Sequence, residues 1–285
     1  MTDQDPDSIE PEPQRDPTEE LACLVGGFRS HLAWLAAQGL GYLPGGPTIR
    51  FSEPVQASAA VADARGDAAP PGADRPAETS SPEDLAVLTS PGLGAAGLTQ
   101  IRNCLGDCHR CRLSQDRVQV VFGQGDPEAD LLFVGEAPGR DEDLAGEAFV
   151  GAAGKLLTKM IKAMGFEREQ VYIGNVIKCR PPRNRNPEPD EIGRCVPFLM
   201  AQLRAIGPKA IVTLGRFAAQ TLLGTDQSIG RLRGRLHPFT LDGREMVLAP
   251  TYHPAYLLRN PEAKRPVWED LQRVMEWLGD HGAGG

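Results

Sequence analysis

An apolar run ends abruptly in an acidic turn within Ala129-Asp-Leu-Leu-Phe-Val-Gly-Glu-Ala-Pro-Gly-Arg-Asp-Glu-Asp143. Residues 131–134 are all apolar, which is typical of a strand covered on both faces. Gly135, Pro138 and Gly139 then prevent a regular helix or strand from continuing. Because ligands of open α/β sheets bind at such strand ends, this turn is the first candidate for a functional site. The alternative is an ordinary strand exit followed by a solvated acidic loop.

Alternating strand and helix signals surround this stretch. Apolar runs predict strands at 130–134, 171–177 and 210–215. Periodicity of 3.6 residues predicts helices at 151–165, 189–206, 216–223 and 264–278. Segments 238–241 and 245–249 flank Asp242-Gly243, which predicts a hairpin or a strand bend. The alternation indicates an α/β fold with a parallel sheet between layers of helices.

The first third of the chain differs from the rest in composition. Residues 1–17 are acidic and rich in proline, which predicts disorder. An amphipathic helix is expected at 21–35, and we favour its packing against the main domain over the binding of a partner. The apolar face of this helix carries Leu24, Phe28, Leu32 and Leu35.

Ala, Pro, Asp and Ser then dominate from about residue 54 to residue 91, which is typical of a linker. Short helices near Pro82 and Leu98 would lead into the folded part. We therefore divide the chain into an N-terminal extension (1–54), a linker (55–95) and a catalytic domain (96–285).

Charge is distributed unevenly along the 285 residues, which carry a formal net charge of −8. Residues 1–98 hold 15 Asp and Glu against 5 Lys and Arg, whereas residues 99–285 hold 23 against 25. Binding of a polyanion would therefore need a local basic face. The sequence has no run of about 20 apolar residues and no basic start of a signal peptide, so we expect a cytoplasmic protein that does not bind membranes.

Four of the six cysteines form two pairs. Cys108-His-Arg-Cys111 is a C-x2-C motif, and Cys179 and Cys195 flank the basic, proline-rich loop 180–190. In a cytosolic chain such pairs favour a metal over disulfides. A four-thiolate site would tie the edge of the domain to a loop that has no other means of being held, and it suits zinc or an iron–sulfur cluster.

The other two cysteines have different interpretations. Cys23 falls in the N-terminal helix and is expected to be a small core residue. Cys104 is a spare or alternate ligand, and His109 is expected to be exposed.

Several motifs follow the C-x2-C pair in a specific order. They are Gly135-Glu-Ala-Pro-Gly-Arg-Asp-Glu-Asp143, Phe149-Val-Gly151, Asn175-Val-Ile-Lys-Cys-Arg-Pro-Pro182, Cys195 and His253-Pro-Ala-Tyr-Leu-Leu-Arg-Asn-Pro261. From about residue 100 to the C-terminus, this combination resembles the family 4 uracil-DNA glycosylases, the iron–sulfur members of their superfamily.

The resemblance implies a three-layer α/β/α fold around a four-stranded parallel sheet. It also implies hydrolysis of the N-glycosidic bond of uracil in single- or double-stranded DNA without cleavage of the backbone, which initiates base excision repair. We expect the protein to act as a monomer. The cofactor would be a 4Fe-4S cluster bound by Cys108, Cys111, Cys179 and Cys195.

The chain departs from two related groups. A branch that cross-links to uracil DNA uses a histidine in the loop that corresponds to 180–190, and this loop has none. The best-known uracil glycosylases have a water-activating Asp where this chain has Ala137 and a thymine-excluding Tyr where it has Gly139. Those two roles must be filled differently here.

Recognition of uracil requires extrusion of the nucleotide from the duplex into a pocket. Phe149 offers a flat apolar ring for stacking on the base. Asn175 offers an amide that can donate to uracil O4 and accept from N3–H, and its neighbours must fix its orientation to exclude cytosine. Gly135 and Ala137 would complete the base pocket.

Cleavage leaves negative charge on uracil and positive charge on the sugar. His253 can donate a hydrogen bond to uracil O2, although a lone histidine is more often a loop residue with satisfied hydrogen bonds. Glu136 can orient water or stabilise the sugar cation. Its competitors in the same loop are Asp141, Glu142 and Asp143.

Binding of DNA would use basic and apolar side chains around the pocket. The residues expected to meet phosphates are Arg180, Arg183, Arg185 and Arg259. Leu257 and Leu258 would enter the duplex at the vacated position. A solvated basic loop and a buried helix start are the structural alternatives.

Two other functions are compatible with the residues. One is a protein that binds uracil or damaged DNA without turnover, and the other is a four-Cys zinc module with an RNA or protein partner. Formation of alkali-labile sites on uracil DNA would distinguish an excising enzyme from the first alternative. The brown colour of an iron–sulfur protein would oppose the second.

Overall fold

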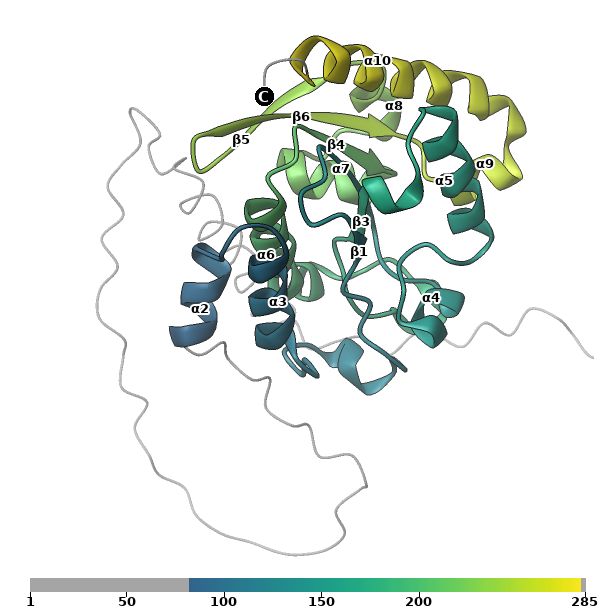
Figure 1. Ribbon diagram of the computed structural model, residues 1–285. Coiled ribbons are helices and arrows are strands. Elements are labelled where there is room, and N and C mark those ends of the chain that lie inside the picture. Colours follow the sequence, from purple (N-terminus) through teal and green to yellow (C-terminus); the bar gives the residue numbers. More distant parts are fainter. Residues whose placement is uncertain (1–81, 283–285) are drawn as a thin grey trace, which may run out of the picture.

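The computed structural model describes residues 82–282 (Figure 1). The predictions for residues 1–17, the helix at 21–35 with Cys23, and the linker as far as residue 81 lie outside the described residues.

The core of the fold is a mixed sheet of six strands in the order β1-β3-β2-β4-β6-β5. The strands are β1 (Gln124–Gly125), β2 (Leu131–Gly135), β3 (Tyr172–Asn175), β4 (Ala210–Leu214), β5 (His237–Leu241) and β6 (Arg244–Thr251). Strands β3, β2, β4 and β6 run parallel, whereas β1 and β5 are antiparallel edges. The expectation of a purely parallel sheet of four strands is therefore wrong.

Each antiparallel edge has a local cause. Asp242 (φ 50°) and Gly243 (φ 78°) both adopt left-handed backbone, as in the tight turns that join antiparallel strands, so β5 must return along β6. Strand β1 has only two residues and pairs with β3 through Gln124 and Gly125, which leaves no alternating pattern to detect.

Helices cover both faces of the sheet (Figure 1). Leu131 and Phe133 face α5 (Ala152–Ala163), α9 (Pro254–Arg259) and α10 (Lys264–Gly282). Leu132 and Val134 face the opposite side. That side is covered by α6 (Pro189–Ile206) and α7 (Arg216–Leu223).

The described order also contains α3 (Gly94–Leu105), α4 (Arg140–Ala145) and α8 (Ile229–Leu232). Strands 131–135 and 210–214 and the helices at 152–163, 189–206 and 216–223 confirm the corresponding predictions.

The folded unit includes a helix within the expected linker. Helix α2 (Pro82–Thr89) packs against α3 and α6. Leu88 is buried with Ile101 and Phe198, and Asp84 pairs with Arg110 at 2.8 Å. The short helix expected near Pro82 is present, and residues 82–95 contribute apolar side chains and an ion pair to the domain.

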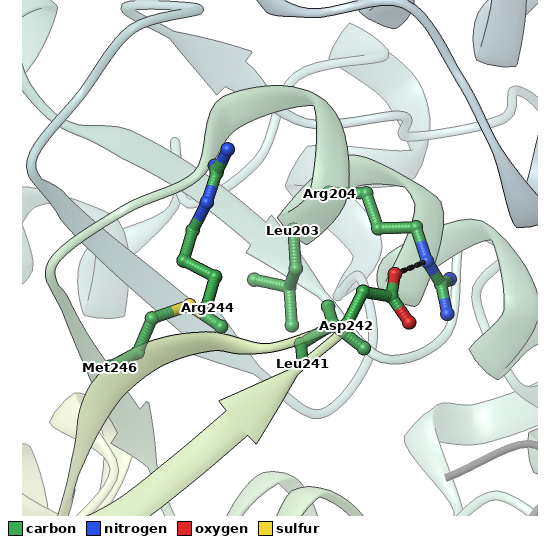
Figure 2. A pocket seen from close by; sticks show the side chains of 6 residues that line it. All are labelled: Leu203, Arg204, Leu241, Asp242, Arg244 and Met246. Atoms are coloured by element: carbon green, nitrogen blue, oxygen red, sulfur yellow. Dashed lines mark hydrogen bonds and ion pairs between the residues drawn. The ribbon is translucent and has the colours of Figure 1, made fainter. Parts of the chain in front are cut away.

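A small cavity of about 110 Å³ lies at the end of the sheet where β4 and β6 begin (Figure 2). Its lining residues are Leu203, Arg204, Leu241, Asp242, Arg244 and Met246. Arg204 closes one side by donating to Asp242 at 2.6 Å. This cavity is remote from the strand ends that carry the acidic turn. Within residues 82–282, none of the helices combines the length and apolar character needed to cross a membrane.

Candidate active site

The carboxyl ends of β2 and β3 bring three predicted residues into contact. Gly135 is paired in register with Asn175. A Cβ atom on Gly135 would lie 2.3 Å from Asn175 Oδ1 and 2.5 Å from Phe149 Cζ. Only glycine leaves room at this position for the amide and the ring to lie side by side.

The Phe149 ring is held by the acidic turn. Phe149 is buried and has φ 55°, a left-handed backbone that costs a non-glycine residue about 1–2 kcal/mol. Glu142 Oε1 accepts the N–H groups of Val150 (3.0 Å) and Gly151 (2.9 Å), and Oε2 accepts Gly139 N–H (3.1 Å). One carboxylate thus joins the turn after β2 to the loop that presents the ring.

Asn175 presents a buried acceptor without a partner. The residue is 1% exposed, and no hydrogen bond to its Oδ1 is found within residues 82–282. A buried polar atom left unsatisfied costs about 1–3 kcal/mol. A ligand N–H placed beside Gly135 would remove this penalty.

His253 lies after β6 as the N-cap of α9. Its Nδ1 accepts the Ala255 N–H at 3.1 Å, so the proton of the neutral ring is on Nε2. Its ring centroid is 5.7 Å from that of Phe149. Burial lowers the pKa of His253 to about 4, against an opposing effect of Glu142. The ring is therefore a neutral hydrogen-bond donor at pH 7.

Glu136 is partly buried directly after Gly135, and burial raises its pKa to about 7 while Arg216 acts in the opposite direction. Two of its competitors have structural partners: Glu142 holds the ring loop, and Asp143 accepts the N–H of Val118 at 2.9 Å. Asp141 is exposed. Within the described chain, no hydrogen bond of the Glu136 side chain is found, so this carboxylate is available to a ligand.

Two further residues lie close to these strand ends. Ala137 packs against the apolar cluster on the α6 face. Arg216, which the sequence analysis did not single out, begins α7 directly after the strand end of β4 and acts on the charge of Glu136. The sequence could have indicated Arg216, because Gly215 ends an apolar run in the same way as Gly135.

The two cysteine pairs lie near one another. Burial raises the pKa of the Cys179 thiol, and negative charge on Cys195, Cys111 and Cys108 raises it further. N–H groups point at the sulfur atoms: Arg117 donates to Cys179 (3.5 Å), and Arg110 donates to Cys108 (3.4 Å).

The thiols of residues 82–282 do not form a ready site for one ion, since no group of three or more His, Cys, Asp or Glu side chains there is arranged to hold a metal ion. Cys104 is not a spare ligand in this arrangement. Its thiol donates to Asp84 Oδ1 at 3.1 Å, and burial together with Asp84 raises its pKa to about 12. His109 is only partly exposed and contacts Asp107 at 3.2 Å.

The loop 180–190 has a second means of being held, which corrects the sequence analysis. Glu191, whose side chain is fully buried, accepts hydrogen bonds from Arg185 (2.6 and 2.9 Å) and from Arg112 (3.0 Å). Burial acts to raise the Glu191 pKa, but these hydrogen bonds lower it below its usual value. Arg112 follows Cys111, so the carboxylate ties the two cysteine-bearing segments together.

Comparison with known proteins agrees with this geometry. Residues 122–272 match the model of the uracil DNA glycosylase superfamily. The chain belongs to this superfamily. A type-4 uracil-DNA glycosylase of Sulfurisphaera tokodaii is 47% identical over 184 residues, which cover 63% of this chain and 84% of the relative. Those of Archaeoglobus fulgidus (45% identical; 60% and 88% covered) and Thermotoga maritima (44%; 61% and 91%) are similarly related.

In this member of the superfamily, the two leucines that were expected to enter the duplex differ in exposure. Leu257 is 1% exposed and belongs to the core beneath α9, so the alternative of a buried helix start is correct for it. Leu258 is 49% exposed. Of these two leucines, only Leu258 has an exposed side chain.

The four arginines predicted to bind phosphate in this superfamily member also differ, because some are exposed and others have partners within the protein. Arg183 and Arg259 are exposed. Arg180 donates to Asn184 at 2.7 Å. Arg185 is engaged by Glu191, so its guanidinium serves the loop, and the expectation that it meets phosphate is not supported by this geometry.

Proposed function

We propose that this chain is a monofunctional uracil-DNA glycosylase that flips uracil out of DNA and hydrolyses its N-glycosidic bond, the first step of base excision repair. The observation that carries the proposal is the unsatisfied Asn175 Oδ1 beside the Phe149 ring, with a neutral His253 facing that ring. The names of the type-4 relatives support it, since the chain covers 84% to 91% of the three compared above.

Recognition follows from the shape and polarity of the pocket. The Phe149 ring would stack on the extruded base, a contact worth about 1–3 kcal/mol. Asn175 Oδ1 would accept uracil N3–H. The corresponding nitrogen of cytosine carries no hydrogen, so cytosine would leave the buried oxygen facing another acceptor. Gly135 leaves the edge of the base free of steric hindrance.

Bond cleavage would use two side chains in different roles. As the bond between sugar C1′ and uracil N1 breaks, negative charge collects on uracil O2, where His253 Nε2–H donates. Glu136 would orient the water whose oxygen adds to C1′, and it would stabilise the sugar cation. The released uracil takes up a proton. Because the Ala255 N–H fixes the tautomer, the His253 donor is in place before the substrate binds.

The proximity of the two cysteine pairs supports a shared iron–sulfur cluster. We propose that Cys108, Cys111, Cys179 and Cys195 bind a 4Fe-4S cluster that holds the two loops to each other. Their mutual electrostatic influence and the N–H groups directed at sulfur support this assignment. The catalytic residues act without any step on the cluster.

Contact with DNA would surround the pocket. Exposed Arg183 and Arg259 would bind phosphates, and Leu258 would fill the space that the extruded nucleotide leaves.

The decisive experiment measures excision on an oligonucleotide with one uracil, in which alkali cleaves the strand only where the base has been lost. The parental protein should form such sites. His253→Ala should slow single-turnover excision about 100-fold with little change in DNA affinity or iron content. Asn175→Ala should instead weaken uracil binding and selectivity over cytosine. Tight binding without alkali-labile sites would establish a binding protein and refute the proposal.

A parallel test concerns the cluster. Cys108→Ala or Cys195→Ala should give colourless protein that lacks iron, because each removes one of four ligands. Cys104→Ala is the matched control, since its thiol contacts Asp84, and it should keep its iron. Iron loss in all three variants would contradict the ligand assignment, and zinc in the parental protein would contradict the iron–sulfur cluster.

A further inference from the structure

One buried lysine contacts both a cysteine of the proposed cluster site and the strand end that carries Asn175. Lys178 is 0% exposed, and its ammonium donates to the main-chain carbonyl of Asn175 at 2.8 Å and to Gln202 Oε1 at 2.6 Å. Its own main-chain N–H donates to the Cys195 sulfur at 3.2 Å. Cys179 follows it directly in the chain. A single residue therefore connects two parts of the molecule with different predicted roles.

The surroundings of the ammonium are neutral. Gln202 is itself buried, and its amide donates to the Phe122 carbonyl (2.9 Å) and to the Tyr172 hydroxyl (3.2 Å). No ion pair between Lys178 and a carboxylate is found among residues 82–282. Burial of an ammonium is costly unless its hydrogen bonds are made, so its two acceptors, the Asn175 carbonyl and Gln202 Oε1, determine where it lies.

Asn175 has no hydrogen bond within the described chain that would fix its side-chain Oδ1. The place of that oxygen is set by the backbone of β3 and by contact with Gly135. The ammonium of Lys178 anchors this backbone at the Asn175 carbonyl itself. A misplacement of about 1 Å in a group that positions the substrate can lower the rate of an enzyme about 100-fold.

We propose that Lys178 is a positioning residue for uracil recognition. Through it, the cysteine-bearing segments around Cys179 and Cys195 hold the Asn175 amide in place. This inference rests on the proposed function, because it concerns the same pocket. It assigns Lys178 no contact with the base. The residue acts through the Asn175 main chain.

The test measures binding and not turnover, with DNA that contains 2′-fluoro-2′-deoxyuridine, whose glycosidic bond resists cleavage. Lys178→Met keeps the length of the side chain but removes the donor and the charge. We expect normal iron content and at least about tenfold weaker binding of the analogue, with no change for the same DNA containing cytosine. Lys162→Met is the control, since this exposed lysine on α5 pairs with Glu167 at 3.1 Å, and the variant should bind normally.

A double-mutant cycle identifies the route of the effect. In the Asn175→Ala background, Lys178→Met should weaken analogue binding no further. An equal loss in both backgrounds, or parental affinity of Lys178→Met, would overturn the inference.

Iron loss in Lys178→Met would assign Lys178 to retention of the cluster and would also overturn the inference. Parental protein that binds the analogue but leaves ordinary uracil DNA intact would refute the proposed function alone.

Discussion

Burial shifts the pKa values of Glu136 and His253 in opposite directions, and each shift favours the neutral form. Glu136 has a pKa of about 7, so its carboxylate becomes available only as the pH rises through neutrality. His253 has a pKa of about 4 and stays neutral over the same range.

The single-turnover excision rate should therefore rise between pH 6 and pH 8 and then level off, because only the ionised Glu136 can orient water or stabilise the sugar cation. Glu136→Gln should abolish this rise and lower the rate at pH 8 about 100-fold. No second change due to His253 is expected between pH 5 and pH 9. An unchanged profile in Glu136→Gln would assign the rise to another group.

A second prediction concerns Gly135. Its backbone is not left-handed, so Gly135→Ala should fold, but the new Cβ would overlap Asn175 Oδ1 and the Phe149 ring. Overpacking of this kind costs about 1–3 kcal/mol, which should weaken binding of uracil-analogue DNA at least about tenfold. Gly230→Ala is the matched control, since its Cβ would meet no atom within 4 Å. Equal affinities in the two variants would contradict the role of Gly135.

At this scale, the sequence was informative where one residue type is chemically distinctive. Asn175 and His253 stood in recognisable motifs, and the structure places both near Phe149. The sequence could not separate the carboxylates of the acidic turn, because Glu142 and Asp143 differ from Glu136 only in the N–H groups that the fold brings to them. The hydrogen bonds from Arg185 to Glu191 could not be predicted for the same reason, since folding brings the two side chains together.

At the scale of elements, helix α9 presents adjacent leucines to opposite environments. Leu257→Ala should lower the free energy of unfolding by about 2–5 kcal/mol, because it leaves a cavity in the core. Leu258→Ala should change it by less than about 0.5 kcal/mol but reduce excision from double-stranded DNA relative to single-stranded DNA. Denaturant unfolding and the ratio of the two excision rates provide the measurements. A duplex-specific defect in Leu257→Ala at full stability would reverse the assignment.

Element type followed from periodicity wherever an element was long and well covered. Strands β2 and β4 are buried on both faces and mostly apolar, and α5 and α6 show a regular apolar stripe, so their positions were predictable. Strand β1 was not, because two residues carry no period. The directions of the edge strands depend on pairing partners, which a local pattern does not specify.

At the scale of the whole molecule, helix α2 determines where the catalytic unit can be cut. A fragment beginning at residue 82 should retain iron and uracil excision. A fragment beginning at residue 95 should unfold at a lower denaturant concentration, because it loses buried Leu88 and the Asp84–Arg110 ion pair. Equal stability of the two fragments would show that α2 contributes nothing to the domain.

The antiparallel edges of the sheet also affect how copies of the chain meet. A long, flat outer strand offers unpaired N–H and C=O groups to a neighbouring molecule and so promotes aggregation. Here β1 spans only two residues, and β5 contains Pro238, which has no N–H to donate. The sheet therefore offers a neighbouring molecule few places at which to add a strand.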